Sequence, residues 1–472
     1  MQNTRAKLIF VPLFLLQAMT FVACGGSGDG NAVVSRTTQE KLQGTWEQRG
    51  YGRALQIAST SVTYYDFTSE TCVRGETESL GEFAVALNDI AQDEDEFQLR
   101  DTALGFSERY SRIGSLPTTC GQPISAQPTE IFHHVWHTFQ ELYAFFPERD
   151  VDWLAQYDAV RDDVHDGMSD AELFAALQTL VGPIDDVHVS ISTPDGNVFS
   201  PGQPKGFYLD LLAEFAEQSD VPTPGQYFDQ ELSKALAIID DVYLDEEYRQ
   251  AGGPTGDFFK WGLIGERTGY LSIGAFILQF DRTIADQLLD VEEVMDQALT
   301  DLADTEALIV DVRLSPGGAD PIALAIAQRF VDARRLAMRK ITRTSEGESS
   351  GQDLFVAPST RVQYDNPVVI LTSGYSASAT EVFTLAMRAL PHVTVVGEPT
   401  IGALSDVLEK TLPNGWQIGL ANEVYFDADG FSYEATGIPP DVSVPAFAKQ
   451  ERDIGQDSAI NAALTALGID LQ

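Results

Sequence analysis

The sequence has few basic residues for its length. Its 472 residues include 30 Lys and Arg against 71 Asp and Glu, which gives a formal net charge of −41. A chain this acidic argues against a nucleic-acid partner, which needs a basic patch. The acidic surface fits simple solvation, with a weak preference for basic ligands. With 44% hydrophobic and 21% charged residues, the chain is globular and long enough for two or three domains.

Metal-binding and thiol chemistry lack their usual sequence patterns. The chain has three cysteines and six histidines, with no CxxC and no HExxH. His133 and His137 lie one helical turn apart and could bind a metal, but a place on a helix surface is the simpler interpretation. We therefore expect no metal site and no organic cofactor.

The first 23 residues have the pattern of an export signal. Arg5 and Lys7 form a positive start, and an apolar stretch from Leu8 to Ala23 follows. This stretch runs into FVAC, which resembles a bacterial lipobox and implies cleavage before Cys24 and lipidation of Cys24. The alternative is an ordinary signal peptide with an incidental cysteine. No later apolar run is long enough to span a bilayer, so we expect an anchored protein.

The expected location follows from this signal. Residues 24–42 are glycine-rich at their start and would form a flexible tether behind the lipid. Gly25, in place of an aspartate, indicates sorting to the outer membrane in a Gram-negative host. We expect an exported protein of the bacterial cell envelope, held at the outer membrane and facing the periplasm or the cell surface.

Residues 43–122 are predicted to form a small β-barrel or sandwich, because short alternating segments and turn residues recur at close spacing. The segment contains no catalytic constellation, and we interpret it as a binding or spacer module. Cys72 and Cys120 lie within it. Export to an oxidising compartment favours a disulfide between them, and two buried thiols are the alternative.

A helical subdomain and an α/β core follow. Residues 127–192 carry apolar residues at helical spacing, and Ser169 stands as an N-cap before the second helix. Residues 193–260 form a connecting segment with one predicted helix near Gln230 to Val242. From 261 to 472, apolar strands alternate with helices, which predicts a mainly parallel sheet flanked by helices on both faces. Ligands of such sheets gather beyond the carboxyl ends of the strands.

Three stretches at strand ends carry candidate functional residues. In TSGYSASATEVF, Ser378 lies just before a helix, whose free N–H groups favour an oxyanion. The same stretch fits a plain capping box of Ser378 and Glu381, which is the simpler interpretation on this stretch alone. In LIVDVRLSPGGAD, Gly317 and Gly318 would let N–H groups approach a ligand, or form an ordinary turn. His188, in IDDVHVSIS, could be a general base for a serine or a structural residue.

Together these stretches resemble the C-terminal-processing and tricorn-like serine peptidases, the tail-specific protease superfamily. The likeness covers residues 127 to 445 and is carried by DVRLSPGG, SASATE, VVGEPTIGALSD, LPNGW and YEATGIPPDV. It implies a ClpP- or crotonase-like α/β peptidase core with Ser378 as the nucleophile. It also implies an oxyanion hole from the backbone at Ser378 or Ala379 and from a glycine of the pair Gly317 and Gly318.

The chain departs from the branch of the superfamily that pairs its serine with a lysine. Where that branch has a GKG-like turn, this chain reads IGALSD and places Ala403 at the position of the lysine. Alanine cannot accept a proton, and Lys410 lies seven positions further along, so it is a weak substitute. Tail-specific members also usually carry a PDZ module, and residues 193–260 show no such pattern.

The tricorn-like branch takes its base from an upstream histidine, and His188 in IDDVH matches that position. The same branch places a glutamate three residues before the glycine of a GxxPD stretch, which is Glu434 here. The resemblance implies that His188 is the general base and that Glu434 orients it or completes its hydrogen-bond network. A serine precedes the histidine in that branch. Val187 stands there in this chain, so Ser405 or Ser190 would have to supply the hydroxyl.

The sequence therefore predicts a lipid-anchored serine peptidase that hydrolyses peptides or unfolded polypeptides through an acyl-enzyme on Ser378. Its partners would be these substrates and the membrane, and its oligomeric state is left open. A second hypothesis is a non-catalytic ligand-binding protein on the same fold, because the superfamily includes a retinoid-binding branch. A third is an envelope scaffold that acts through the β domain.

Overall fold

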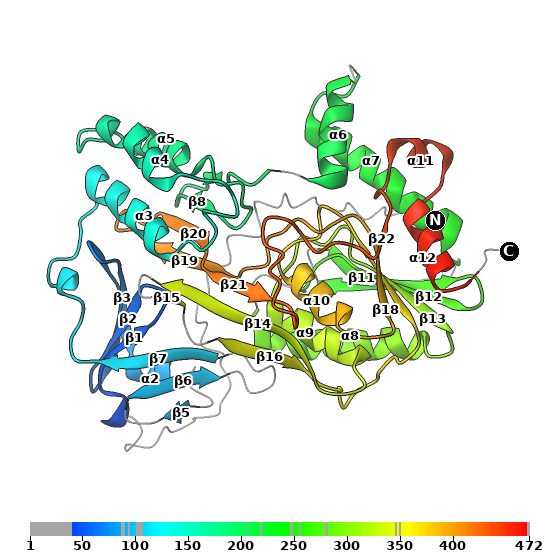
Figure 1. Ribbon diagram of the computed structural model, residues 1–472, viewed down its shortest axis with the longest axis horizontal. Coiled ribbons are helices and arrows are strands. Elements are labelled where there is room, and N and C mark those ends of the chain that lie inside the picture. The colour runs from blue at the N-terminus through cyan, green and yellow to red at the C-terminus, as the bar shows by residue number, and fades with distance from the viewer. Residues whose placement is uncertain are drawn as a thin grey trace.

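The computed structural model describes residues 40–85, 90–92, 95–100, 107–203, 205–217, 220–245, 249–253, 256–278, 282–344, 347–348 and 351–469. The predicted signal peptide, the lipidation site at Cys24 and most of the predicted tether lie outside these residues. The described chain forms a β domain, a helical subdomain and an α/β core (Figure 1). None of the helices described is both long enough and apolar enough to cross a membrane.

The β domain is built on one antiparallel sheet. Its elements are β1 (Gly44–Gln48), β2 (Arg53–Ile57), β3 (Ser61–Phe67), β4 (Cys72–Ser79), α2 (Leu80–Val85), β5 (Ile90–Gln92), β6 (Glu96–Arg100) and β7 (Ser107–Ile113). The strands pair in the order β4-β3-β2-β1-β7-β6-β5. The core centres on Phe97, whose ring lies 4.7 Å from those of Trp46 and Tyr110. A disulfide joins Cys72 to Cys120 in η2 (Thr118–Gly121) and ties the sheet to the following linker.

The helical subdomain packs on a four-stranded sheet that it shares with the C-terminal part of the chain. Its elements are α3 (Pro128–Leu142), α4 (Trp153–Val160), η3 (Arg161–Asp163), α5 (Asp170–Val181), β8 (Ser190–Ser192) and β9 (Val198–Phe199), and the later strands are β19 (Val407–Thr411) and β20 (Gln417–Ala421). The order is β19-β20-β8-β9, with Ser190 opposite Gly419. Ser169 and Glu172 form a capping box on α5, which confirms the predicted N-cap.

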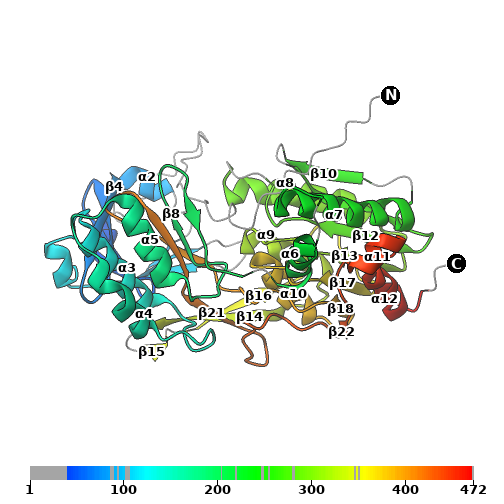
Figure 2. The same ribbon diagram turned by 90° about the horizontal axis from the view of Figure 1, so that it is seen from above.

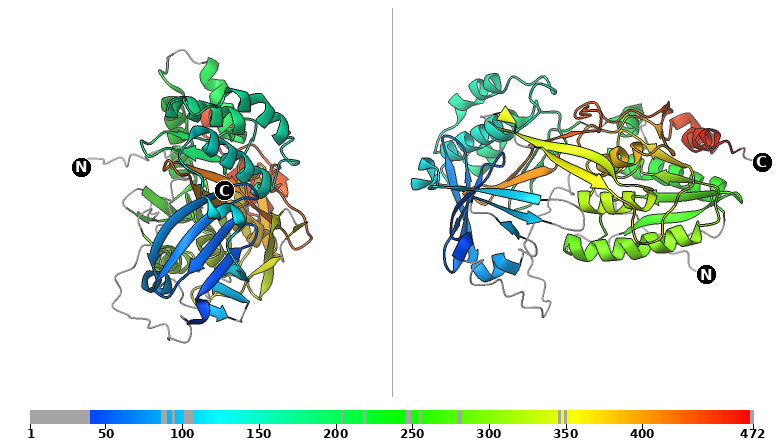
Figure 3. Two further views of the ribbon diagram at one scale, coloured as in Figure 1. Left: turned by 90° about the vertical axis from the view of Figure 1, so that its left-hand side faces the viewer. Right: turned by 60° about the horizontal axis from the view of Figure 1, so that its bottom comes forward.

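The β domain contacts both other parts of the molecule at one end (Figure 3). Thr71 Oγ1 lies 2.7 Å from Nδ1 of His134 on α3. The Lys410 ammonium on β19 lies 2.5 Å from Asp66 of β3, and Asn422 donates to the carbonyl oxygen of Gly50 at 3.0 Å. These polar contacts fix the domain against the sheet shared by the other two parts.

The connecting segment contains two helices where the sequence predicted one. They are α6 (Gly206–Glu217) and α7 (Pro224–Ile238), and η4 (Ile239–Tyr243) follows. Thr223 caps α7 by accepting from the N–H of Gln226, so this helix begins earlier than predicted. The helix α6 was missed because its apolar contacts, Phe207 and Leu211, stand in an acidic stretch without a sequence signal for a helix start.

The core is a seven-stranded sheet flanked by helices. Its strands, in order of pairing, are β10 (Arg249–Gly253), β11 (Gly256–Ile264), β12 (Thr268–Ile273), β13 (Ala307–Asp311), β17 (Val368–Thr372), β18 (Val393–Gly397) and β22 (Val442–Ser443). From β12 to β22 all pairs are parallel. The helices are α8 (Ile284–Asp301), α9 (Asp320–Ala327), α10 (Ala379–Arg388), α11 (Lys449–Ile454) and α12 (Ser458–Ala466), and η5 (Gln328–Phe330) follows α9.

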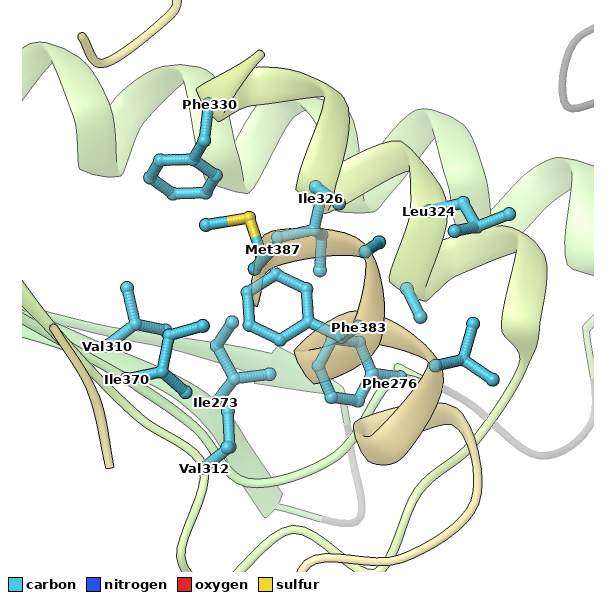
Figure 4. Close-up of a cluster of buried hydrophobic side chains, with 14 of the residues drawn as sticks. Ile273, Phe276, Val310, Val312, Leu324, Ile326, Phe330, Ile370, Phe383 and Met387 are labelled. Carbon is cyan, nitrogen blue, oxygen red and sulfur yellow. The ribbon is translucent and has the colours of Figure 1, made fainter. Parts of the chain in front are cut away.

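Both faces of the parallel strands are covered, as their continuous apolar sequences predicted. Val310 and Ile370 pack with Phe383 and Met387 of α10 (Figure 4). Ile309, the neighbour of Val310, points to the opposite face and packs in a cluster that includes residues of α7 and α12. Because β13 and β17 are parallel neighbours, the loops after them meet at the same edge of the sheet.

A long strand links the core to the helical subdomain. The additional strands are β14 (Arg335–Thr344), β15 (Gly347–Glu348), β16 (Gln352–Val356) and β21 (Glu423–Phe426). The strand β14 pairs with β15, β16 and β21 in a second small sheet. Figure 2 shows β14 and β21 running between the two parts of the molecule. The chain therefore returns to the core after β20, where β22 pairs with β18 and α12 packs on the face of β17 and β18.

Candidate active site

The segment after β17 carries several hydroxyls, and three of them hold two loops together. Ser373 Oγ and Ser376 Oγ donate to the carbonyl oxygens of Arg313 and Val312, at 2.6 and 2.9 Å. Thr380 Oγ1 also donates to a carbonyl oxygen of the loop after β13, at 3.0 Å. These three hydroxyls therefore donate hydrogen bonds that hold the fold together.

Ser378 differs from these neighbours. It is partly exposed, and its backbone has φ +57° and ψ −127°, a conformation that is strained for any residue with a Cβ. It forms the predicted capping box with Glu381, whose Oε2 accepts from the Ser378 N–H at 3.2 Å. The Glu381 N–H donates to the carbonyl oxygen of Ser378 at 2.7 Å. In this capping box the Ser378 Oγ acts only as an acceptor, so the hydroxyl keeps its own proton and could give it to a base.

Gly317 lies directly against Ser378. A Cβ on Gly317 would come within 2.7 Å of the Ser378 Cβ and 3.3 Å of the Ala379 nitrogen. The φ angles of Gly317 and Gly318 are +116° and +145°, and Phe276 holds them by donating its N–H to the Gly317 carbonyl oxygen at 2.8 Å. Ala379 begins α10, so its N–H has no acceptor within the helix. The N–H groups of these residues are candidates for an oxyanion hole.

Glu381 has a second role that the sequence reasoning missed. Its buried carboxylate accepts from Thr400 Oγ1 at 2.5 Å and from the N–H groups of Gly402 and Ala403 at 2.9 and 2.8 Å. Burial raises the pKa of Glu381 to about 7. The carboxylate therefore joins the turn that contains Ser378 to the turn that contains Ala403. A glutamate at the third helical position predicts a cap, but no sequence signal shows these distant partners.

Lys410 contacts the β domain and not the turn that contains Ser378 in the part of the chain that the structure describes. Its Nζ contacts Asp66 at 2.5 Å and donates to the carbonyl oxygen of Gly52 at 3.0 Å, both in the β domain. Its side chain is 2% exposed, and burial lowers the pKa of Lys410 to about 8. The ammonium holds two domains together and is not placed to receive a proton from Ser378.

His188 lies in the turn before β8 and is 5% exposed. The preceding residue, Val187, packs against Ala377 and Ala403, which brings this turn beside the turn that contains Ser378. The His188 N–H donates to Asp186 Oδ1 at 2.9 Å, and the ring Nδ1 is buried with no hydrogen-bond partner among the described residues. Burial has the largest effect on the pKa of His188 and lowers it. The imidazole is therefore neutral near pH 7 and able to accept a proton.

Glu434 lies near this site, but within the described structure it makes no hydrogen bond to His188. Its Oε1 accepts from Arg149 Nη2 at 2.7 Å, and its Oε2 accepts from the N–H groups of Leu404 and Ser405 at 2.8 and 3.3 Å. Direct orientation of the base by Glu434, one of the two predicted roles, is therefore not what the structure shows. Burial raises the pKa of this carboxyl.

Glu434 is connected to His188 through residues that the sequence analysis did not single out. Arg149 Nε lies 3.4 Å from Asp186 Oδ2, and Asp186 in turn accepts from the N–H of His188. Tyr143 donates its hydroxyl to Asp186 at 2.8 Å. Asp186 falls within the IDDVH motif, but a short motif does not show that its carboxylate meets an arginine before the helix α4.

Of the two serines considered as helpers of His188, Ser405 is used in other hydrogen bonds and Ser190 packs against a neighbouring strand. Ser405 Oγ donates to a neighbouring backbone carbonyl at 2.8 Å and accepts from the N–H of Glu423 at 3.1 Å. Ser190 faces Gly419 across the strand pair, and a Cβ on that glycine would lie 2.7 Å from its Oγ. Neither serine hydrogen-bonds to His188 in the part of the chain that the structure describes.

Comparison with known proteins identifies the core. Residues 267–444 match the model of peptidase family S41. The carboxy-terminal-processing protease of Bartonella bacilliformis is 24% identical over 176 residues, which are 37% of this chain and 38% of that protein. The carboxy-terminal processing protease CtpA of Bacillus subtilis is 26% identical over 175 residues, 37% of this chain and 35% of that protein. The core therefore contains a region that matches peptidase family S41.

The likeness to S41 peptidases also extends to the solved fold. A crystal structure assigned as a peptidase from Parabacteroides merdae is 26% identical, with a TM-score of 0.57, and the match covers 73% of this chain and 97% of that chain. These matches confirm the predicted superfamily and the α/β peptidase core. The chain spans 38% and 35% of the length of the two curated relatives. The S41 match contains Gly317, Ser378 and Glu434, whereas His188 precedes it.

Proposed function

We propose that the protein is a serine-type processing peptidase of the tricorn-like Ser/His kind, acting on peptides or unfolded polypeptides. One observation carries the proposal: Ser378 has a strained backbone and lies against Gly317, while the hydroxyls of Ser373, Ser376 and Thr380 are committed to the structure. The S41 core supports hydrolysis of a peptide bond as the reaction. The packing of Val187 beside the turn that contains Ser378 supports His188 as the base.

The proposed reaction proceeds through an acyl-enzyme. His188 takes the proton of the Ser378 hydroxyl while Oγ attacks the carbonyl carbon of the scissile peptide bond. The N–H groups at Gly317, Gly318 and Ala379 stabilise the negative oxygen that forms. The C–N bond then breaks, and His188 gives its proton to the leaving amine. A water molecule, deprotonated by His188, attacks the acyl-enzyme, and the serine takes a proton back as the new carboxylate leaves.

A fluorophosphonate probe tests the nucleophile. The folded wild-type protein should be labelled at Ser378, and the label should be lost in Ser378→Ala and in heat-denatured wild type. His188→Ala should be labelled more slowly, and its hydrolysis of an unfolded protein such as reduced casein should fall in parallel. Wild type that is neither labelled nor active on casein would exclude this function and favour the ligand-binding alternative.

The lipid anchor and the envelope location form part of the same proposal. They are supported by the FVAC sequence at Cys24 and the export-type pattern before it. Metabolic labelling with palmitate should mark the wild-type protein, and Cys24→Ala should lose the label and leave the membrane fraction. An unlabelled wild type recovered in the soluble fraction would show an ordinary signal peptide instead.

A further inference from the structure

A buried arginine connects the two halves of the candidate site. Arg149 follows α3, and its side chain is 3% exposed. Its Nη2 donates to Glu434 Oε1 at 2.7 Å and to the carbonyl oxygen of Gly402 at 3.1 Å. Its Nε lies 3.4 Å from Asp186 Oδ2. One guanidinium thus contacts the helical subdomain at Asp186 and the core at Gly402 and Glu434.

The Asp186 end of this connection holds the turn that carries the base. The Asp186 side chain is fully buried. Its Oδ1 accepts from the N–H of His188 at 2.9 Å, and its Oδ2 accepts from the Tyr143 hydroxyl at 2.8 Å. A shift of this carboxylate would therefore shift the backbone of His188.

The Glu434 end holds the turn that supports the nucleophile. Glu434 Oε2 accepts from the N–H groups of Leu404 and Ser405. These residues directly follow Ala403, whose carbonyl oxygen accepts from the N–H of Ser378 at 3.0 Å. The position of Glu434 is thus transmitted to Ser378 through the bonds from Leu404 and Ser405 to its carboxyl group and the backbone bond between Ser378 and Ala403.

The charges make the arginine necessary for this arrangement. Asp186 and Glu434 are both buried carboxylates, and Arg149 is the cation that both contact. Burial and the charge of Asp186 raise the pKa of Glu434, and the charge of Arg149 lowers it. Without the guanidinium, Glu434 would therefore hold a proton more readily or move away. A planar guanidinium can bond to two acceptors at once, which a lysine cannot do in the same geometry.

We infer that Arg149 is a positioning residue, which holds the His188 turn and the Ser378 turn at their working separation. It does so in a chain where Val187 replaces the serine that precedes the base in the tricorn-like branch. The kinetic part of this inference rests on the proposed function, and its structural part does not.

Replacement of Arg149 tests the kinetic part. Arg149→Met should lower the rate of fluorophosphonate labelling of Ser378 by about 100-fold, because a displacement of about 1 Å between reacting groups has an effect of that size. The KM for a peptide substrate should change little, since Arg149 does not line the oxyanion hole. Arg149→Lys should recover part of the rate, because an ammonium can pair with one of the two carboxylates.

Arg329 provides a matched control. It is another buried arginine, 1% exposed, and it bonds to Asp296 at 2.5 Å and to the carbonyl oxygen of Val362 at 2.9 Å. It follows the C-terminal end of α9, whereas Gly317 and Gly318 precede the N-terminal end of that helix. Arg329→Met should lower the melting temperature as Arg149→Met does and leave the labelling rate per folded molecule unchanged. Equal rates in wild type and Arg149→Met, or equal losses in both variants, would overturn the inference.

A second measurement decides the structural part even if the wild type is inactive. The ring nitrogen signals of His188 can be followed by NMR on protein labelled with 15N-histidine. The positive charge of Arg149 lowers the pKa of His188, and the charge of Asp186 raises it. Arg149→Met should therefore raise the pKa of His188 and shift its signals. Unchanged His188 signals in Arg149→Met would overturn the inference, whereas an unlabelled wild type alone would overturn only the proposed peptidase activity.

Discussion

The backbone N–H of Ser378 donates to the carbonyl oxygen of Ala403, 3.0 Å away. Ala403 is 1% exposed and presents only a methyl group where the Ser–Lys branch of the superfamily has its lysine. The turn at Ala403 therefore supports the nucleophile through its backbone and offers no base. The proposed mechanism therefore takes its proton acceptor from another segment, and the turn of His188 packs against this one through Val187.

Separate replacement of His188 and Lys410 distinguishes the two candidate bases. His188→Ala should lower kcat on a peptide substrate by about 10³-fold, with the remaining rate supplied by the oxyanion hole and substrate binding. Lys410→Met should keep the kcat of the folded protein and lower the free energy of unfolding by about 3 kcal/mol, because Asp66 loses a buried partner. Steady-state kinetics and urea denaturation measure the two effects. A folded Lys410→Met protein without activity would contradict this assignment.

The pH dependence of the reaction follows from the burial of His188. A histidine in water has a pKa near 6.5, and burial lowers the pKa of His188. The ring is then neutral, and able to accept a proton, at pH values where a free histidine is already charged. We expect the acid limb of kcat/KM to lie below pH 6.5 and to be absent from the residual rate of His188→Ala.

The acid limb of kcat/KM could also come from a neighbouring carboxyl group, and two variants distinguish these cases. Glu381 and Glu434 also have raised pKa values, so either could produce a limb near neutral pH. The acid limb should stay in place in Glu381→Gln and in Glu434→Gln if it belongs to His188. A limb that lies above pH 6.5 and disappears in one of these variants would assign the titration to that carboxyl instead.

The parallel sheet and the place of Ser378 directly before a helix could be predicted from local sequence, because both depend on short continuous patterns. The strands β13 and β17 are buried on both faces, and their sequences are therefore mostly apolar. Ser378 stands in a motif of several adjacent residues. The sequence of α6 has no such local pattern, because its apolar residues pack in a cluster that is formed by distant parts of the chain.

The network around the base could not be predicted for a related reason. Arg149 and Glu434 are 285 positions apart, and neither sequence context shows that the two side chains meet. Their pairing depends on how the helical subdomain packs on the strands β19 and β20. The motif around Glu434 predicted a residue near the base but not that an arginine and Asp186 would stand between them.

Gly317 should tolerate no side chain. Gly317→Ala would place a Cβ 2.7 Å from the Ser378 Cβ at a φ of +116°. We expect the labelling rate of Ser378 to fall by about 10²-fold or more, because the oxyanion donors would be displaced. Gly196→Ala is the control, since Gly196 has a φ of +91° with open space around it. It should lose about 1 kcal/mol of stability from backbone strain and keep the wild-type rate. Wild-type labelling of Gly317→Ala would argue against this oxyanion hole.

Glu381 should make stability depend on pH. Burial raises the pKa of Glu381 from 4.5 to about 7. Between these values the folded protein binds a proton that the unfolded chain has released, so the stability contribution of Glu381 is largest below pH 4.5 and falls as the pH rises through 7. A shift of this size corresponds to about 3 kcal/mol. Glu381→Gln keeps the size of the side chain and removes its titration.

The free energy of unfolding of wild type minus that of Glu381→Gln should therefore fall by about 3 kcal/mol between pH 4.5 and 7.5. Urea denaturation of both proteins at several pH values measures this difference, and the other titrating groups cancel because the two chains share them. A difference that does not change with pH would show that the folded carboxyl titrates as it does in water. In that case the hydrogen bonds from Thr400, Gly402 and Ala403 would offset the effect of burial on the pKa of Glu381.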